Sequence, residues 1–190
     1  MSSSIKVRSW SQLTYHPIKE LLPKLRALQI AIAASDTTEK IRNLRTHKLA
    51  RYREGWNACI FLKGISTVLN YSEMSFALNE SQDYDLIGRT VRGDEIHYTP
   101  IQLKEYRGRL GGLTLEQEIQ KIQKKYKDSS DLVVAFYLSG TDSFDLTHIH
   151  LPKLNIASLW FFGCTSKDQT EWVLIGDMLR NPVKSKYKIA

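Results

Sequence analysis

A carboxylate, an amide and an ammonium group are spaced so that one β-hairpin would bring them together. Asp85 precedes Gln102 and Lys104 in the chain, and the Gly-Asp pair at residues 93–94 between them is typical of a two-residue hairpin turn. In an antiparallel hairpin closed by that turn, Asp85 faces Gln102, and Lys104 lies on the same sheet face within diagonal reach. Oxygen ligands suit a hard divalent cation, and a lysine suits a phosphate. The spacing therefore predicts a site for a cation and a phosphate.

The two segments that carry these residues resemble the PD-(D/E)xK nuclease superfamily. They read Tyr84-Asp85-Leu86-Ile87-Gly88 and Pro100-Ile101-Gln102-Leu103-Lys104. In the superfamily, an Asp at the start of one strand is followed by (Asp/Glu)-x-Lys on the next. Tyr84 replaces the proline of that motif and Gln102 replaces its second acid, although Gln-x-Lys is a known variant, for instance in Mrr-type restriction endonucleases. The order of segments from about 38 to 141 is also similar to the superfamily core of helix, three-stranded meander, helix and strand.

The resemblance implies a Mg²⁺- or Mn²⁺-dependent endodeoxyribonuclease of restriction, repair or mobile-element type. In that interpretation the metal ligands are Asp85, Gln102 and the backbone carbonyl of Leu103, and Lys104 orients or deprotonates the attacking water. Because Gln102 is neutral, we expect weaker metal binding than the usual motif gives. The alternative is a nuclease-fold protein that has lost cleavage and binds nucleic acid or another protein.

Many members of the superfamily carry a further acid on the first core helix. Glu54, which precedes Gly64 by ten residues, corresponds to it, although helical phase also puts Glu54 where any solvated glutamate would lie. Glu73, on the first predicted strand, is the substitute. The presence of Lys104 at this position also has a simpler explanation. In the same hairpin register Asp83 lies opposite Lys104, and the two would form an ordinary cross-strand ion pair.

The basic charge is concentrated near the N-terminus. Residues 1–54 hold eleven Lys and Arg against four Asp and Glu, whereas residues 55–190 hold sixteen of each. A basic flank on a neutral domain is typical of DNA binding, because Lys and Arg release counterions from phosphates, but a solvated helix surface has the same composition. The side chains expected to contact DNA are Arg45, Lys48, Gln120 and Lys124.

Length and composition predict one domain, since 190 residues that are 42% hydrophobic can bury a substantial core. Two cysteines without zinc-site spacing indicate a reducing cytoplasm, and no apolar segment suggests export or a membrane. A homodimer would let two sites cut both DNA strands.

Hydrophobic periodicity predicts an α/β protein of the α+β type with a mixed sheet. We expect a basic N-terminal helical extension (1–37), a nuclease-like core (38–141), and additional strands with a frayed basic tail (142–190). Helices are predicted at 17–34, from 38 to Gly64, and at 114–126, and strands at 66–78, 84–91, 96–106, 131–139, 156–164 and 171–175.

Overall fold

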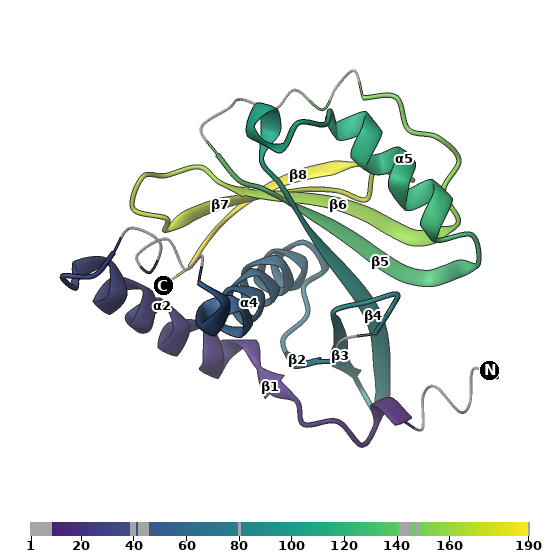
Figure 1. Ribbon diagram of the computed structural model, residues 1–190. Coiled ribbons are helices and arrows are strands. Elements are labelled where there is room, and N and C mark those ends of the chain that lie inside the picture. The colour runs from purple at the N-terminus through teal and green to yellow at the C-terminus, as the bar shows by residue number, and fades with distance from the viewer. Residues whose placement is uncertain are drawn as a thin grey trace.

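A mixed β-sheet forms the centre of the protein. The computed structural model describes residues 9–38, 41, 46–79, 81–140, 146 and 149–189, and within them the sheet has eight strands that follow one another in chain order. Helix α4 (Ala50–Leu69) covers one face of the sheet and helix α5 (Leu115–Lys125) covers the other (Figure 1). The predicted α+β class is therefore confirmed.

The remaining elements follow a simple path. They are β1 (His16–Pro17), α2 (Ile18–Ala34), the 3-10 helix η1 (His47–Leu49), β2 (Met74–Leu78), β3 (Leu86–Arg92), β4 (Glu95–Tyr106), the 3-10 helix η2 (Gly108–Gly111), β5 (Ser129–Leu138), β6 (Ile156–Cys164), β7 (Glu171–Gly176) and β8 (Val183–Lys188). Strands β1 to β4 pair antiparallel, β4 to β6 pair parallel, and β6 to β8 pair antiparallel.

The β3–β4 hairpin has the register that its turn predicts. Arg92 pairs with Glu95, and at the far end Leu86 pairs with Ile101. Gly93 has a φ of 57°, a conformation that glycine adopts without steric cost at the first position of a two-residue hairpin turn. The turn sequence alone therefore fixed which residues face each other across the hairpin.

Helix α4 continues past Gly64 to Leu69, so the predicted helix end and the predicted strand start at 66 are wrong. Gly64 serves packing instead, because a Cβ at this position would lie 2.9 Å from the Tyr187 ring. The Tyr187 hydroxyl donates a hydrogen bond of 2.9 Å to the Ile60 carbonyl of the same helix. Asn70, in the left-handed conformation with a φ of 53°, ends the helix.

The C-terminal tail forms an edge strand, so the predicted frayed tail is wrong. Strand β8 pairs with β7 along its whole length. Tyr187 and Ile189 alternate with exposed lysines and are themselves only 6% and 3% exposed. The basic composition of this segment concealed a strand whose apolar residues face the core.

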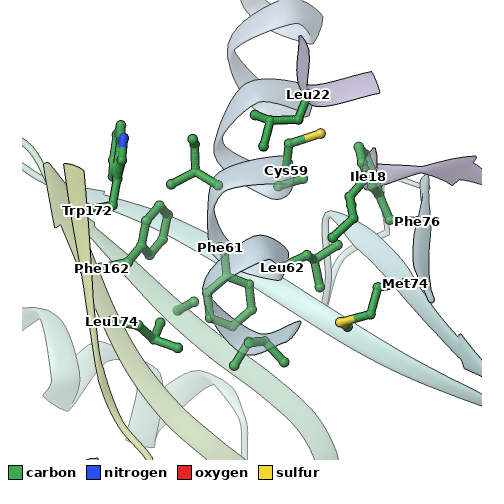
Figure 2. Close-up of a cluster of buried hydrophobic side chains, with 14 of the residues drawn as sticks. Ile18, Leu22, Cys59, Phe61, Leu62, Met74, Phe76, Phe162, Trp172 and Leu174 are labelled. Atoms are coloured by element: carbon green, nitrogen blue, oxygen red, sulfur yellow. The ribbon is translucent and has the colours of Figure 1, made fainter. Parts of the chain in front are cut away.

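The N-terminal segment is joined to the sheet. Strand β1 pairs with β2, and Ile18 and Leu22 of α2 are buried in the core between α4 and the sheet, part of which Figure 2 shows. The predicted helix at 17–34 is confirmed. The helix expected from 38 to Gly64 is not continuous, because Ile41 is helical, residues 46–49 are not α-helical and α4 begins at Ala50, while residues 39–40 and 42–45 lie outside the described residues. In the part of the chain that the structure describes, no helix is both long and apolar enough to cross a membrane.

Candidate functional site

Asp85 and Gln102 are neighbours across the β3–β4 hairpin, on the sheet face that α5 covers. The last paired residues of the hairpin are Leu86 and Ile101, and the Asp85 backbone N–H also donates a hydrogen bond of 3.0 Å to the Ile101 carbonyl, so Asp85 lies just outside the ladder at an irregularity of the β-bulge type. Gln102 contacts Tyr126, the residue that ends α5 and belongs to the core on that face. The side chains of Asp85 and Gln102 are therefore in contact, as the turn predicted, although the paired register ends one residue before them.

The Gln102 side chain connects all the groups predicted to be metal ligands. Its Nε2 atom donates to Oδ2 of Asp85 and, at 3.1 Å, to the Leu103 carbonyl, while its Oε1 atom accepts a hydrogen bond of 2.9 Å from the Tyr126 hydroxyl. The Leu103 backbone N–H donates to the same Asp85 oxygen at 2.9 Å. Gln102 is only 5% exposed, so these bonds are shielded from water. The Asp85 carboxylate and the Leu103 carbonyl thus both point at the amide nitrogen of Gln102.

These oxygens suit a hard cation in type but supply little charge. Rotation of the Gln102 amide group about its last bond would exchange its nitrogen and oxygen, and Tyr126 would keep its contact because a hydroxyl both donates and accepts. Carboxylate, carbonyl and amide oxygens are ligands that Mg²⁺ accepts, and the residues present fit such an ion. Among the described residues, however, no three His, Cys, Asp or Glu side chains gather as a metal-binding group. Within the described part of the chain, Asp85 is the carboxylate that contacts the Gln102 amide group.

Lys104 adds a positive charge beside this network. Burial lowers its pKa, the ammonium of Lys125 lowers it further, and the carboxylate of Asp85 acts in the opposite direction. Lys121 and Lys125, both exposed on α5, are electrostatic neighbours of Lys104. Glu118, which forms an ion pair of 2.9 Å with Lys121, is also an electrostatic neighbour of Lys104, so the three lysines exceed the carboxylates of Asp85 and Glu118 by one positive charge, an excess that favours an anionic ligand.

The two residues of α5 predicted to contact DNA point elsewhere. Gln120 and Lys124 are exposed, and the lysines of α5 that lower the pKa of Lys104 are Lys121 and Lys125, not Lys124. The side that flanks β4 carries Lys121 and Lys125. The apolar stripe alone did not decide this, because Gln120 and Lys121 lie at similar angles on either side of it.

The other sequence candidates lie apart from the Asp85 network. Glu54 belongs to α4, which packs on the opposite face of the sheet, and Glu73 is exposed in the loop before β2. Lys48 is exposed in η1, and Arg45 lies outside the described residues. Asp83 is exposed, and among the ion pairs of the described residues none joins it to Lys104.

Tyr126, Lys121 and Lys125 are site residues that were not predicted from the sequence. Burial raises the pKa of the Tyr126 hydroxyl, which keeps it protonated as a hydrogen-bond donor to Gln102. The Lys125 ammonium lies 4.8 Å from the centroid of the Tyr126 ring and also donates to the Gln82 carbonyl. The basic sequence at the end of α5 gave no sign of these contacts, because they depend on how the helix packs against the hairpin.

Comparison of the chain with protein-family models, with curated proteins and with solved structures finds no match.

Proposed function

We propose that the protein is a metal-dependent endodeoxyribonuclease that hydrolyses DNA phosphodiester bonds. The observation that carries this proposal is the convergence of the Asp85 carboxylate and the Leu103 carbonyl on one point beside the Gln102 amide group. The arrangement of α4, β2 to β4, α5 and the parallel strand β5 also supports a restriction endonuclease-like core, because its order is that of the superfamily. That the protein acts in the cytoplasm, as a homodimer that cuts both strands, stays a prediction.

Each residue has a defined task in this proposal. Asp85 and the Leu103 carbonyl bind a Mg²⁺ or Mn²⁺ ion, and Gln102 turns its amide oxygen toward it while Tyr126 holds the rotated group. The bound ion would polarise the scissile phosphate and lower the pKa of a water molecule. Lys104, Lys121 and Lys125 attract the phosphate backbone and offset the negative charge that develops during attack.

A second function is favoured by one specific observation. In the structure the Gln102 amide nitrogen satisfies both oxygens that would hold the ion, so the network is complete without a metal. A protein with this arrangement could bind nucleic acid through the same lysines and never cut it. The two proposed functions use the same lysine-bearing surface, and they differ in whether the protein hydrolyses the nucleic acid that it binds.

Nicking of supercoiled plasmid DNA in the presence of Mg²⁺ or Mn²⁺ distinguishes them. We expect the wild-type protein to nick the plasmid and Asp85→Asn to lose activity by at least about a hundredfold, since it removes the carboxylate that contacts the Gln102 amide group. Asp83→Asn is the matched control, because Asp83 lies two residues away on an exposed position and should not affect cleavage.

The outcome decides between the two proposals. Equal nicking by Asp85→Asn and by the wild type would show that Asp85 takes no part in cleavage. If the wild type binds DNA but does not nick it with either metal, the protein is a binding module.

A further inference from the structure

A second candidate site lies on the other face of the sheet. A cavity of about 750 Å³ opens between the C-terminal half of α4 and strands β3, β4 and β6, on the side of Ile101 rather than that of Gln102. Its volume is within the range of pockets that hold small molecules. Its inner wall is apolar and largely buried, and consists of Leu62, Ile65, Met74, Ile101 and Trp160.

The polar residues of the cavity give it an excess of positive charge. Arg92 and Arg180 line it, Asp177 is the single acidic residue among its lining residues, and His97, which also lines it, lies 3.3 Å from Glu95. The Asp177 carboxylate already accepts hydrogen bonds of 3.0 Å from the backbone N–H groups of Leu159 and Leu179, and it lies 3.7 Å from Arg180. Charge complementarity therefore favours an anionic ligand over a cationic or neutral one.

Arg92 is held in position to meet such an anion. Its guanidinium carbon lies 4.4 Å from the centroid of the Tyr71 ring, a cation–π contact that orients the group. In the part of the chain that the structure describes, no carboxylate forms an ion pair with Arg92. The donors of this arginine are thus available to a ligand carboxylate, which a guanidinium binds through paired hydrogen bonds.

Two large apolar side chains at the same cavity are exposed to water. Leu69 and Val183 line the cavity and are 44% and 46% exposed, which places them among the five large hydrophobic residues that the described surface leaves open. Exposed apolar groups gathered at a cavity are typical of a ligand-binding surface.

We propose that this cavity binds an amphipathic monocarboxylate, with its hydrocarbon chain against Leu62, Ile65 and Ile101 and its carboxylate at Arg92. This inference does not depend on the proposed nuclease activity, because the two sites lie on opposite faces of the sheet and share no residue. The apolar wall accounts for the chain, and the unpaired guanidinium accounts for the acid group.

The test is calorimetric titration of the full-length protein with straight-chain alkanoates from hexanoate to decanoate, and with the matching alcohols. Each added methylene should raise the affinity about fourfold, because burying a CH₂ group is worth about 0.8 kcal/mol. The carboxylates should bind about tenfold more tightly than the alcohols of equal length, because only they bring an opposite charge and accept two paired hydrogen bonds from the guanidinium.

Two variants and a control locate the ligand. Arg92→Met keeps the length of the side chain and should abolish the preference for carboxylates while leaving alcohol binding unchanged. Val68→Phe, at a half-buried cavity position on α4, should weaken both series by at least about tenfold because it fills the space. Arg89→Met is the control, since Arg89 neighbours the Tyr15 ring and not the cavity.

Three results would overturn the proposal. The first is an affinity that does not change with chain length, and the second is a carboxylate preference that survives Arg92→Met. The third is unaltered binding by a Val68→Phe variant whose circular dichroism spectrum and melting temperature match those of the wild type.

Discussion

Replacing Gln102 by glutamate should make the folding stability of the protein depend on divalent cations. In the wild type, the Gln102 amide nitrogen donates to the Asp85 carboxylate and to the Leu103 carbonyl. Glutamate cannot donate at this position when it is ionised, so Gln102→Glu removes both hydrogen bonds, leaves the Asp85 oxygen with only the bond from the Leu103 backbone N–H, and places two carboxylates against each other. Tyr126 can still donate to the new carboxylate, so the fold itself should survive.

The expected loss can be estimated from these bonds. A hydrogen bond to a charged group contributes about 1.5–3 kcal/mol and one to a neutral carbonyl about 0.5–1.5 kcal/mol, so Gln102→Glu should lower the free energy of unfolding by roughly 2–4 kcal/mol. For a protein of this size that corresponds to a decrease in Tm of about 10 °C. A divalent cation that binds the two carboxylates at a hundredfold excess over its Kd restores about 2.7 kcal/mol, or about 8 °C.

Thermal unfolding followed by circular dichroism, with EDTA or with Mg²⁺, measures both effects. Gln120→Glu is the matched control, because it makes the same chemical change on the exposed side of α5 and should neither lower Tm nor gain Mg²⁺ dependence. If Gln102→Glu melts at the wild-type temperature in EDTA, the amide nitrogen does not hold the two oxygens together. If Mg²⁺ fails to raise the Tm of Gln102→Glu above that of the control, these oxygens do not form a cation site.

Three further predictions concern the lysines of α5 and the packing of the last strand. Changing both Lys121 and Lys125 to glutamine should reduce the slope of log affinity for DNA against log salt by about 2, whereas Lys124→Gln should change the slope little. If a salt titration gives the double variant and Lys124→Gln the same slope, the assigned helix face is wrong. Tyr187→Phe should lower stability by about 1 kcal/mol in chemical denaturation through loss of the bond to Ile60, and an unchanged midpoint would show that the bond contributes nothing. Gly64→Ala should lower Tm although alanine favours helices, because its Cβ would lie 2.9 Å from the Tyr187 ring, and a higher Tm would refute that close approach.

The structure also changes how the basic N-terminus can be tested. Removing residues 1–37 would delete β1 and the buried residues Ile18 and Leu22, so the truncated chain would lose part of its core along with its charge. Replacing exposed basic residues such as Lys19 and Lys24 by glutamine changes the charge without that loss. A smaller salt dependence of DNA binding in this double variant would assign the N-terminal charge to the interface, and an unchanged dependence would assign it to a solvated surface.

Local signals in the sequence were enough where they determine geometry directly. The turn at residues 93–94 predicted the register of the β3–β4 hairpin from Arg92–Glu95 to Leu86–Ile101, because a two-residue hairpin turn sets which residues face each other. The apolar spacing of Leu115, Ile119 and Ile122 fixed the buried side of α5, and the apolar run after it gave β5. These features depend on a few neighbouring residues.

Tertiary packing decided what such signals could not. Gly64 looked like a helix end and instead makes room for Tyr187, which lies far away in the sequence. The lysines of β8 suggested a frayed tail, although Tyr187 and Ile189, which alternate with lysines, are buried in the core. Likewise, the contact of Tyr126 with Gln102 arises only when α5 packs on the hairpin. The sequence by itself determined the chemistry and register of the candidate site, whereas the tertiary structure decided which long-range partners hold its side chains, since burial and close approach depend on the whole fold.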